Sequence, residues 1–280
     1  MAGTRRLLGV GWSGDPRVKP PYGAAEIDWG HRLSRNLGLC LLLNEQGGIP
    51  RDLAWTLNGS GAGGPWVHTA TGPARNYNSN TVHTQFPSSA VLQAGANISS
   101  NLILVPNVTL TTTANTHRAG NKNTEWWWLQ GNGASLGTGG MNWDTQNNTG
   151  GHQIASLGEP INAGVVTHLT GLTDVAGFGV RVYRDGVLKG TTAWSGGNPP
   201  ASSNVVTVGN SHALATHVDS AIVLLQFWQR TLSADEVLEL HAEPYAMLRP
   251  RVARRYFVPA AAGGLPIPIV YQRRRQMQVA

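Results

Sequence analysis

The sequence predicts an all-β, antiparallel β-sandwich with one short C-terminal helix. Short apolar or alternating runs recur from Leu39 onward, and turn residues separate them at short intervals. This spacing is typical of a sandwich or a barrel. The composition agrees: 35 Gly, 16 Pro and a charged fraction of 13% do not suit a helical protein, whereas 41% hydrophobic residues are ample for a packed core.

The predicted helix follows an apolar strand near the C-terminal end of the sandwich. Ser233 is expected to be its N-cap, and Glu236 three residues later completes a capping box. Leu232 before the cap and Val237 at the fourth helical position form the accompanying hydrophobic staple. Pro244 ends the helix.

The clearest predicted hairpin lies in the second half of the sandwich. Val180 and Val182 alternate with Arg181 on the opposite face, and Asp185–Gly186 supplies the positive φ angles of a two-residue turn. Residues 131–151 are rich in Gly and Asn and are predicted to form a long loop. Strands are predicted at residues 39–44, 53–57, 81–86, 102–113, 125–130, 153–157, 165–172, 179–184, 187–192, 205–209 and 222–228.

Three regions follow from these patterns. Residues 1–36 lack a clear period and are predicted to be an extended N-terminal arm, and residues 37–248 form the sandwich domain. Residues 249–280 are predicted to be a basic C-terminal arm, interrupted by Pro and Gly. This arm makes the protein basic, because residues 1–248 hold 14 basic and 15 acidic residues.

The C-terminal arm is the predicted partner-binding segment. Arginine forks bind carboxylates in pairs of hydrogen bonds, and aromatic side chains fill apolar clefts on a partner. We expect this role for Arg249, Arg251, Arg254, Arg255, Tyr256, Phe257, Arg273, Arg274 and Arg275. Nucleic-acid binding by these arginines is a weaker alternative, since no recognition fold accompanies them.

The single cysteine, Cys40, excludes an internal disulfide framework and is predicted to be a buried thiol, because it lies in the apolar run 39–43. No apolar run reaches the length of a transmembrane helix, so no membrane partner is expected. No export signal is expected either, because the apolar stretch after Arg5–Arg6 is too short.

Three segments resemble the laminin G-like, concanavalin A-like jelly-roll domains found in proteins of tailed phages. They are IDWGHRLSRNLGLCLLLNEQGG with RDLAWTLNGS (residues 27–48 and 51–60), THLTGLTDVAGFGVRVYRDGVLKGTT (167–192) and RTLSADEVLELHAEPYAMLRP (230–250). The resemblance implies a jelly roll within a structural protein of a virion. Many such domains bind calcium through Asp-rich turns, but the comparable stretch RNYNSNTVHTQF (75–86) has no carboxylate, so no cofactor is expected.

Catalytic signals in the sequence are incomplete. Glu26-Ile27-Asp28 resembles the start of the Glu-x-Asp-x-Glu pattern of glucanases with this fold, but Gly30 stands where the second glutamate would be. The sequence G-A-S-L-G at 133–137 matches a nucleophile elbow without the strand and helix that the motif needs. The histidines show no metal-ligand spacing. We therefore predict no catalytic, metal or cofactor residues.

Tryptophans are the candidate sugar contacts, because lectins hold sugar rings on stacked aromatic side chains. In a strand, Trp126 and Trp128 share one face and Trp127 lies on the other, so core packing is the default for this run. Trp143, with Asp144 and Asn142 beside it in the Gly/Asn-rich stretch, is the better candidate for a glycan contact.

The leading functional prediction is a non-enzymatic structural protein of a phage virion, most simply a capsid decoration or accessory protein anchored by its terminal arms. Its partners would be capsid or other virion proteins and further copies of itself, and its location the virion, after synthesis in the host cytoplasm. The alternative is a carbohydrate-binding adhesin or tail-fibre module that recognises host glycans. A glycan-cleaving enzyme that uses Glu26 is a third hypothesis.

Overall fold

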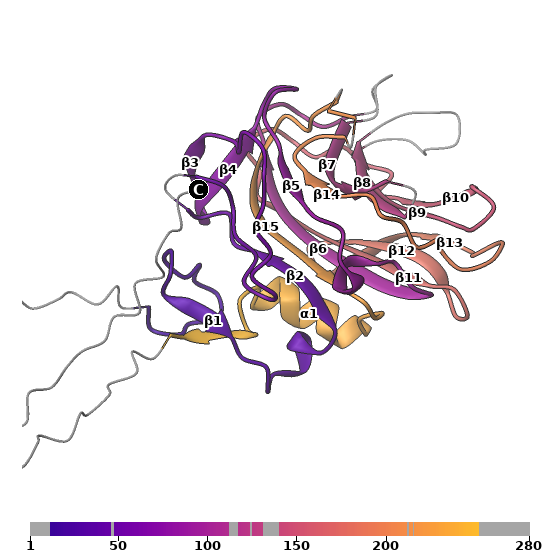
Figure 1. Ribbon diagram of the computed structural model, residues 1–280, viewed down its shortest axis with the longest axis horizontal. Helices are drawn as coiled ribbons and strands as arrows, with labels where there is room; N and C mark the ends of the chain where they lie inside the picture. The colour runs from indigo at the N-terminus through magenta and orange to yellow at the C-terminus, as the bar shows by residue number, and fades with distance from the viewer. Residues whose placement is uncertain are drawn as a thin grey trace, which may run out of the picture.

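The computed structural model describes residues 12–45, 48–111, 117–123, 125–130, 140–211, 213–214 and 216–251. Within these residues, two antiparallel sheets lie face to face, and the single α-helix lies against the outer face of the larger sheet (Figure 1). This confirms the predicted all-β sandwich with one short C-terminal helix. Among the described residues, no helix has the length and apolar character that crossing a bilayer requires.

The larger sheet is built around β15 (Ser220–Trp228), which pairs with β6 along one edge and with β4 and β2 along the other. Its order is β13 (Val187–Thr192), β12 (Gly179–Arg184), β11 (Thr167–Asp174), β6 (Asn97–Pro106), β15, β4 (Gly72–Tyr77) and β3 (Trp66–Thr69), with β2 (Leu37–Leu41) beside β15.

The smaller sheet faces β6, β11 and β15 across the core (Figure 1). Its order is β10 (His152–Ser156), β9 (Met141–Gln146), β8 (Trp126–Gln130), β7 (His117–Lys122), β14 (Val206–Val208) and β5 (Thr84–Phe86). A short 3-10 helix, η2 (Ala90–Leu92), follows β5.

A layer of aromatic side chains fills the space between the sheets. Trp126 stacks on Phe227 with ring centroids 5.1 Å apart, and Trp143 lies 5.8 Å from Trp126 and 5.1 Å from Trp128. All four side chains are completely buried. Trp126 and Trp128 therefore enter the core together, as the alternation of side chains along a strand predicts.

A second core covers the outer face of the larger sheet. Here α1 (Ala234–Ala242), η1 (Arg32–Ser34) and the two-stranded sheet of β1 (Ala25–Ile27) and β16 (Leu248–Pro250) pack on β15 and β2. Every residue of β15 and β2 is consequently buried. Cys40 in β2 is a fully buried free thiol, which confirms its prediction.

The N-terminus of α1 has the predicted capping box. Ser233 Oγ accepts a hydrogen bond from the Glu236 amide (3.2 Å), and a Glu236 carboxylate oxygen accepts one from the Ser233 amide (2.9 Å). The Asp185–Gly186 turn of the β12–β13 hairpin is confirmed as well, with φ of 51° and 78°. Both structures depend on short-range sequence signals.

Three expectations are corrected. Residues 141–146, predicted within a long loop, form strand β9. Residues 53–57, predicted as a strand, instead form an irregular segment beside β2, where Leu53 donates a hydrogen bond to the Cys40 carbonyl. Residues 12–36, predicted as an arm, are packed on the sandwich, because Trp12, Ile27 and Leu33 are buried in the second core.

Candidate functional site

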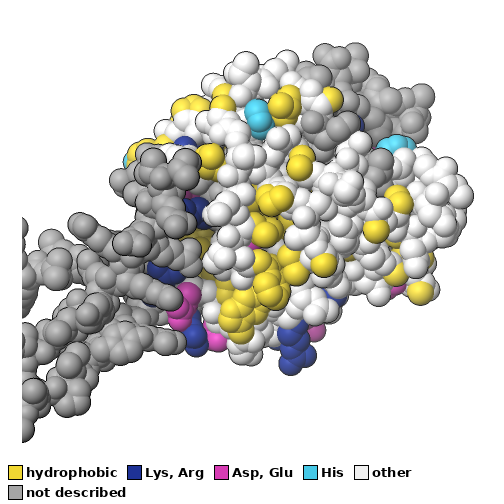
Figure 2. All heavy atoms as spheres, viewed as in Figure 1, with side chains coloured by type: hydrophobic (Ala, Val, Ile, Leu, Met, Phe, Trp, Pro, Cys, Tyr) yellow, Lys and Arg dark blue, Asp and Glu magenta, His cyan; other side chains and the backbone are white. Residues whose placement is uncertain are grey.

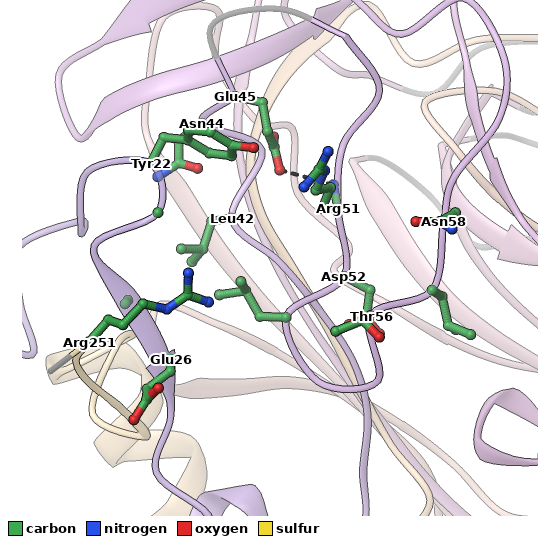
Figure 3. A pocket seen from close by; sticks show the side chains of 14 residues that line it. Tyr22, Glu26, Leu42, Asn44, Glu45, Arg51, Asp52, Thr56, Asn58 and Arg251 are labelled. Carbon is green, nitrogen blue, oxygen red and sulfur yellow. Dashed lines mark hydrogen bonds between the residues drawn. The ribbon is translucent and has the colours of Figure 1, made fainter. Parts of the chain in front are cut away.

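A pocket of about 140 Å³ opens at the edge of the second core, where three segments of the N-terminal part of the chain meet Arg251 (Figure 3). The first is the strap, which we define as residues 19–26; the second is the chain that follows β2; and the third is the 51–58 loop. Its lining combines polar side chains with an apolar floor and consists of Tyr22, Gly23, Ala25, Glu26, Leu42, Asn44, Glu45, Arg51, Asp52, Leu53, Thr56, Leu57, Asn58 and Arg251.

Asp52 shapes the 51–58 loop. One carboxylate oxygen accepts hydrogen bonds from the amides of Cys40 (2.9 Å) and Ala54 (3.0 Å), and the other accepts one from the Trp55 amide (2.7 Å). Burial raises the pKa of this carboxyl group, although these amide hydrogen bonds oppose the shift. Because the backbone occupies both oxygens, Asp52 holds the loop against β2 rather than presenting a free carboxylate to the pocket.

Two buried polar side chains fix the strap. Asn44 donates from Nδ2 to the Pro20 carbonyl (2.6 Å), and Lys19 Nζ donates to the carbonyls of Val223 (2.7 Å) and Pro73. Burial of Lys19 lowers its pKa to about 7. The strap is thereby tied to β15 and β4, and Tyr22 and Glu26 are held over the pocket (Figure 3).

Glu45 is held by hydrogen bonds at two points and is almost fully buried, with 5% of its surface exposed. Its carbonyl accepts a hydrogen bond from Arg75 Nη2 (2.7 Å), and its Oε1 accepts one from the Arg51 amide (2.9 Å). Its Oε2 is buried without a hydrogen-bond partner. A buried, unpaired polar atom costs about 1–3 kcal/mol, and more when it is charged. A ligand that donates a hydrogen bond to this oxygen would remove that cost.

Two predicted arm residues, Arg249 and Arg251, belong to the folded body instead. Arg249 in β16 forms ion pairs with Glu26 (3.0 Å) and Asp28 (3.7 Å). The Arg251 amide donates to the Ala24 carbonyl (2.8 Å), and its side chain lines the pocket (Figure 3). A boundary between domain and arm at residue 249 is therefore wrong for these two residues. The other predicted partner-binding residues, Arg254, Arg255, Tyr256, Phe257, Arg273, Arg274 and Arg275, lie outside the described residues.

The predicted glycan contact Trp143 is also corrected. Its indole is completely buried between the sheets, and Nε1 donates to Thr173 Oγ1 (3.0 Å), so it offers no surface to a sugar. The sequence MNWDTQ alternates apolar and polar residues with the period of a strand, a signal hidden by the Gly- and Asn-rich flanks.

Asn142 and Asp144 point to the opposite face of β9 from Trp143 and are likewise fully buried. Asp144 Oδ2 lies 2.7 Å from His152 Nδ1 on β10. Burial raises the pKa of Asp144, and the hydrogen bond with Asp144 raises the pKa of His152. This ion pair joins neighbouring strands, and it is separate from the pocket.

The comparisons with known proteins agree with the sandwich. The family model Laminin_G_3, described as "Concanavalin A-like lectin/glucanases superfamily", matches residues 78–238, which is more than half of the chain. The chain belongs to the concanavalin A-like lectin/glucanase superfamily. The matched segment of this concanavalin A-like protein begins after the pocket segments, so the family assignment does not cover them. Curated protein sequences give no significant match.

Solved structures of low sequence identity share the concanavalin A-like fold. The binding domain of Paraclostridial Mosquitocidal Protein 1 has a TM-score of 0.58 and 14% identity over 87% of this chain and 69% of that one. Domain 4 of AbnA, an extracellular arabinanase from Geobacillus stearothermophilus solved in complex with arabinotriose, has a TM-score of 0.55 and 17% identity over 78% and 99%. The binding domain of botulinum neurotoxin serotype G has a TM-score of 0.53 and 18% identity over 74% and 50%, so half of that chain has no counterpart here.

Proposed function

We propose that this protein is a non-catalytic carbohydrate-binding protein whose site is the pocket around Glu45. The observation that carries the proposal is Glu45, a residue of the pocket lining whose Oε2 is buried without a hydrogen-bond partner. A sugar hydroxyl group is a suitable donor for this oxygen. It is neutral, compact and able to accept a second hydrogen bond at the same time.

The charges around the pocket suit a neutral ligand. Glu26 and Glu45 contribute acceptors, whereas Arg51 and Arg251 contribute donors. Acidic and basic groups thus face one another across a small volume. A polyhydroxylated ring can donate to the first pair and accept from the second. A strongly charged ligand would meet repulsion from one of the pairs.

The size and floor of the pocket suit a single sugar ring. Cavities of about 150 Å³ in other proteins hold a ring of six heavy atoms, so this open pocket of about 140 Å³ can take up part of one sugar while its remaining hydroxyl groups stay outside. Leu42, Leu53 and Leu57 lie among its lining residues, and the half-exposed ring of Tyr22 stands at the edge. Carbon–hydrogen faces of a sugar pack on such surfaces, while its hydroxyl groups reach the polar lining.

The comparisons support the same proposal at the level of fold. One similar structure holds arabinotriose, and others are toxin binding domains. Attachment to a phage particle remains a separate proposal, based on the sequence resemblance and on the tail residues beyond 251. It is compatible with glycan recognition, since a virion protein can also carry a binding module for the host surface.

Glycan binding is tested by an array screen followed by titration calorimetry on the best ligand. Glu45→Gln keeps the size of the side chain but removes its charge. We expect it to weaken binding about tenfold, because hydrogen bonds to charged groups contribute about 1.5–3 kcal/mol and 1.4 kcal/mol corresponds to a factor of ten. The matched control is Glu159→Gln, which alters an exposed ion-paired carboxylate on the far edge of the larger sheet.

A stability measurement separates a ligand-binding role of Glu45 from a structural one. Glu45→Gln keeps an oxygen that can accept from the Arg51 amide, so it should change the free energy of unfolding by less than about 1 kcal/mol. Loss of binding without loss of stability supports the proposal. An array with no reproducible ligand, or equal affinity of wild type and Glu45→Gln, contradicts it. Release of reducing sugar that Glu26→Gln abolishes would establish the enzymatic alternative instead.

A further inference from the structure

Two tryptophans on the surface beside the pocket are half exposed. Trp29 and Trp55 expose 51% and 49% of their surfaces, and their ring centroids lie 5.6 Å apart at an interplanar angle of 53°. Figure 2 shows apolar side chains gathered on one face of the molecule, over the region between β1 and α1. We call Trp29 and Trp55 the tryptophan platform. Exposed apolar patches often mark the sites at which a protein binds a ligand or a partner.

The platform is held rigidly before any ligand arrives. Trp55 Nε1 donates to the Leu37 carbonyl (2.7 Å), and the Trp55 amide is bound by Asp52 (2.7 Å). Trp29 lies in a turn that Asp28 stabilises: the Gly30 amide donates to Asp28 Oδ1 (3.1 Å), and the His31 amide donates to the Asp28 carbonyl (3.0 Å). A rigid aromatic surface loses little conformational entropy when a ligand binds to it.

Trp55 lies within the 51–58 loop that lines the pocket, and Trp29 lies shortly after the strap. Trp55 stands between Leu53 and Thr56, which line the pocket, and Trp29 follows the lining residue Glu26 by three positions. Three residues of fully extended chain span at most about 10 Å. Trp55 Nε1 donates to the Leu37 carbonyl at the start of β2, whereas Leu42 and Glu45 follow the end of β2. A ligand that reaches both the pocket and the platform is therefore an oligosaccharide that extends along the 51–58 loop.

We propose that Trp29 and Trp55 form a second subsite, on which a further ring of the glycan stacks, so that the ligand is a neutral oligosaccharide of two or more rings. This inference rests on the proposed function of the pocket. The apolar face of a sugar ring is chemically matched to an indole surface. Neither indole carries a charge, which suits a neutral ligand.

The experiment compares a monosaccharide with its di- and trisaccharide by titration calorimetry. The wild type is expected to bind the trisaccharide at least tenfold more tightly than the monosaccharide. In Trp29→Ala this gain should fall about tenfold, while the affinity for the monosaccharide stays the same. Trp29→Ala is the primary variant, because it leaves the Trp55–Leu37 hydrogen bond in place. Trp55→Phe tests the second ring with a smaller aromatic side chain.

Trp194→Ala is the matched control, since Trp194 is a partly buried indole after β13, at the opposite edge of the larger sheet. Equal affinity for mono- and trisaccharide, or an equal loss in Trp194→Ala, overturns the second subsite while the pocket proposal stands. Absence of any sugar binding overturns both. Concentration-dependent dimers that Trp29→Ala converts to monomers would assign the platform to self-association and overturn the inference.

Discussion

His168 lies at the contact between the larger sheet and α1. It is almost fully buried; its Nε2 contacts Asn101 Oδ1, and its ring centroid lies 5.6 Å from that of His241 on the helix. Its amide donates to Asp185 Oδ1 (3.0 Å) at the hairpin turn. Burial, with a smaller contribution from His241, lowers the pKa of His168 to about 3. The imidazole is therefore neutral in the folded protein at neutral pH.

The lowered pKa of His168 predicts that protonation of this residue alone makes the protein less stable in acid. Below a pH of about 6.5 the unfolded chain binds a proton at His168, whereas the folded chain does so only near pH 3. The free energy of unfolding should therefore fall as the pH drops through this window, by at most about 1.4 kcal/mol per pH unit. Urea unfolding of wild type and His168→Gln at pH 7.5, 5.5 and 4.5 measures the difference. A parallel decline in both proteins would contradict the assignment.

The contrast between Trp143 and Glu45 shows how far single residues are predictable. The sequence suggested Trp143 as a glycan contact because glycines and asparagines surround it, yet it is buried in β9, which pairs with β8 and β10. Glu45 had no local signal, since it simply follows the apolar run of β2. Its site exists because Arg75 on β4 and the strap approach it, contacts that only the folded chain brings together.

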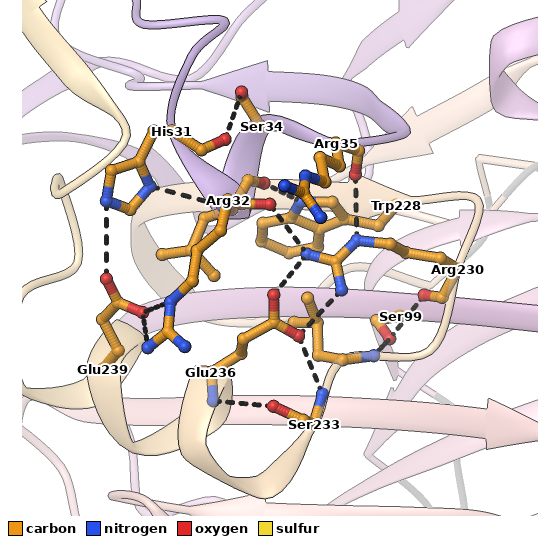
Figure 4. A network of polar contacts seen from close by, with 12 residues as sticks. His31, Arg32, Ser34, Arg35, Ser99, Trp228, Arg230, Ser233, Glu236 and Glu239 are labelled. Carbon is orange, nitrogen blue, oxygen red and sulfur yellow. Dashed lines mark hydrogen bonds and ion pairs between the residues drawn. The ribbon is translucent and has the colours of Figure 1, made fainter.

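At the scale of elements, the start of α1 is joined to the chain before β2 by a polar network. Arg230 donates two hydrogen bonds to the Glu236 carboxylate (2.8 and 2.7 Å) and one to the Arg35 carbonyl (2.9 Å), while Arg32 and His31 contact Glu239 (Figure 4). The capping box and this network share Glu236, so the same carboxylate starts the helix and fixes the segment that carries η1.

This sharing predicts unequal effects of two substitutions. Ser233→Ala removes the N-cap hydrogen bond and should lower the free energy of unfolding by about 1 kcal/mol. Glu236→Ala also removes two charge-assisted hydrogen bonds from Arg230, so it should cost about 3 kcal/mol. Chemical denaturation measures both, and Asp235→Ala in the exposed first turn is the control, with an expected change of a few tenths of a kcal/mol. A smaller effect for Glu236→Ala than for Ser233→Ala would show that the network adds nothing.

Elements with a clear local signal were predicted, and very short strands with distant partners were not. The capping box and the Asp185–Gly186 turn are local, and β12 and β13 begin and end at their predicted residues. In contrast, β1 and β16 are three residues long and pair across more than 200 positions of sequence. A strand of three residues is too short to show the alternation of apolar and polar side chains, so the sequence alone predicted extended arms at residues 1–36 and 249–280.

At the scale of the whole molecule, the last described residues pair with a strand near the start of the described chain. In the register of β1 and β16, Ala25 faces Pro250 and Glu26 faces Arg249. Arg251, one residue further, reaches the pocket. The strap, the pocket and the second core thus depend on residues 248–251, although the family match ends at residue 238.

Two truncations that differ by three residues test this dependence. Removal of residues 252–280 keeps β16, the Arg249–Glu26 ion pair and the Arg251 side chain, so we expect glycan affinity to be retained. Removal of residues 249–280 also deletes most of β16, the Arg249–Glu26 ion pair and the Arg251 side chain from the pocket. We expect the shorter protein to bind glycan at least tenfold more weakly.

The same two truncations distinguish anchoring by the tail from glycan binding by the pocket. If the tail anchors the chain to a phage particle, the 252–280 truncation should fail to enter particles and still bind glycan. Incorporation of this variant at the normal level would contradict anchoring by the tail. Identical glycan affinity of the two truncations would contradict the role of β16 and Arg251 in the pocket.

The solitary thiol of Cys40 has a practical consequence. It lies in β2 between the two cores, and burial, with a smaller contribution from Asp52, raises its pKa to about 12. Alkylating reagents attack thiolates. The Cys40 thiol should therefore not react with them until β2 separates from β15. The rate at which Cys40 is alkylated therefore measures how often β2 opens. A cysteine engineered at the surface would accept a fluorescent label without competition from Cys40.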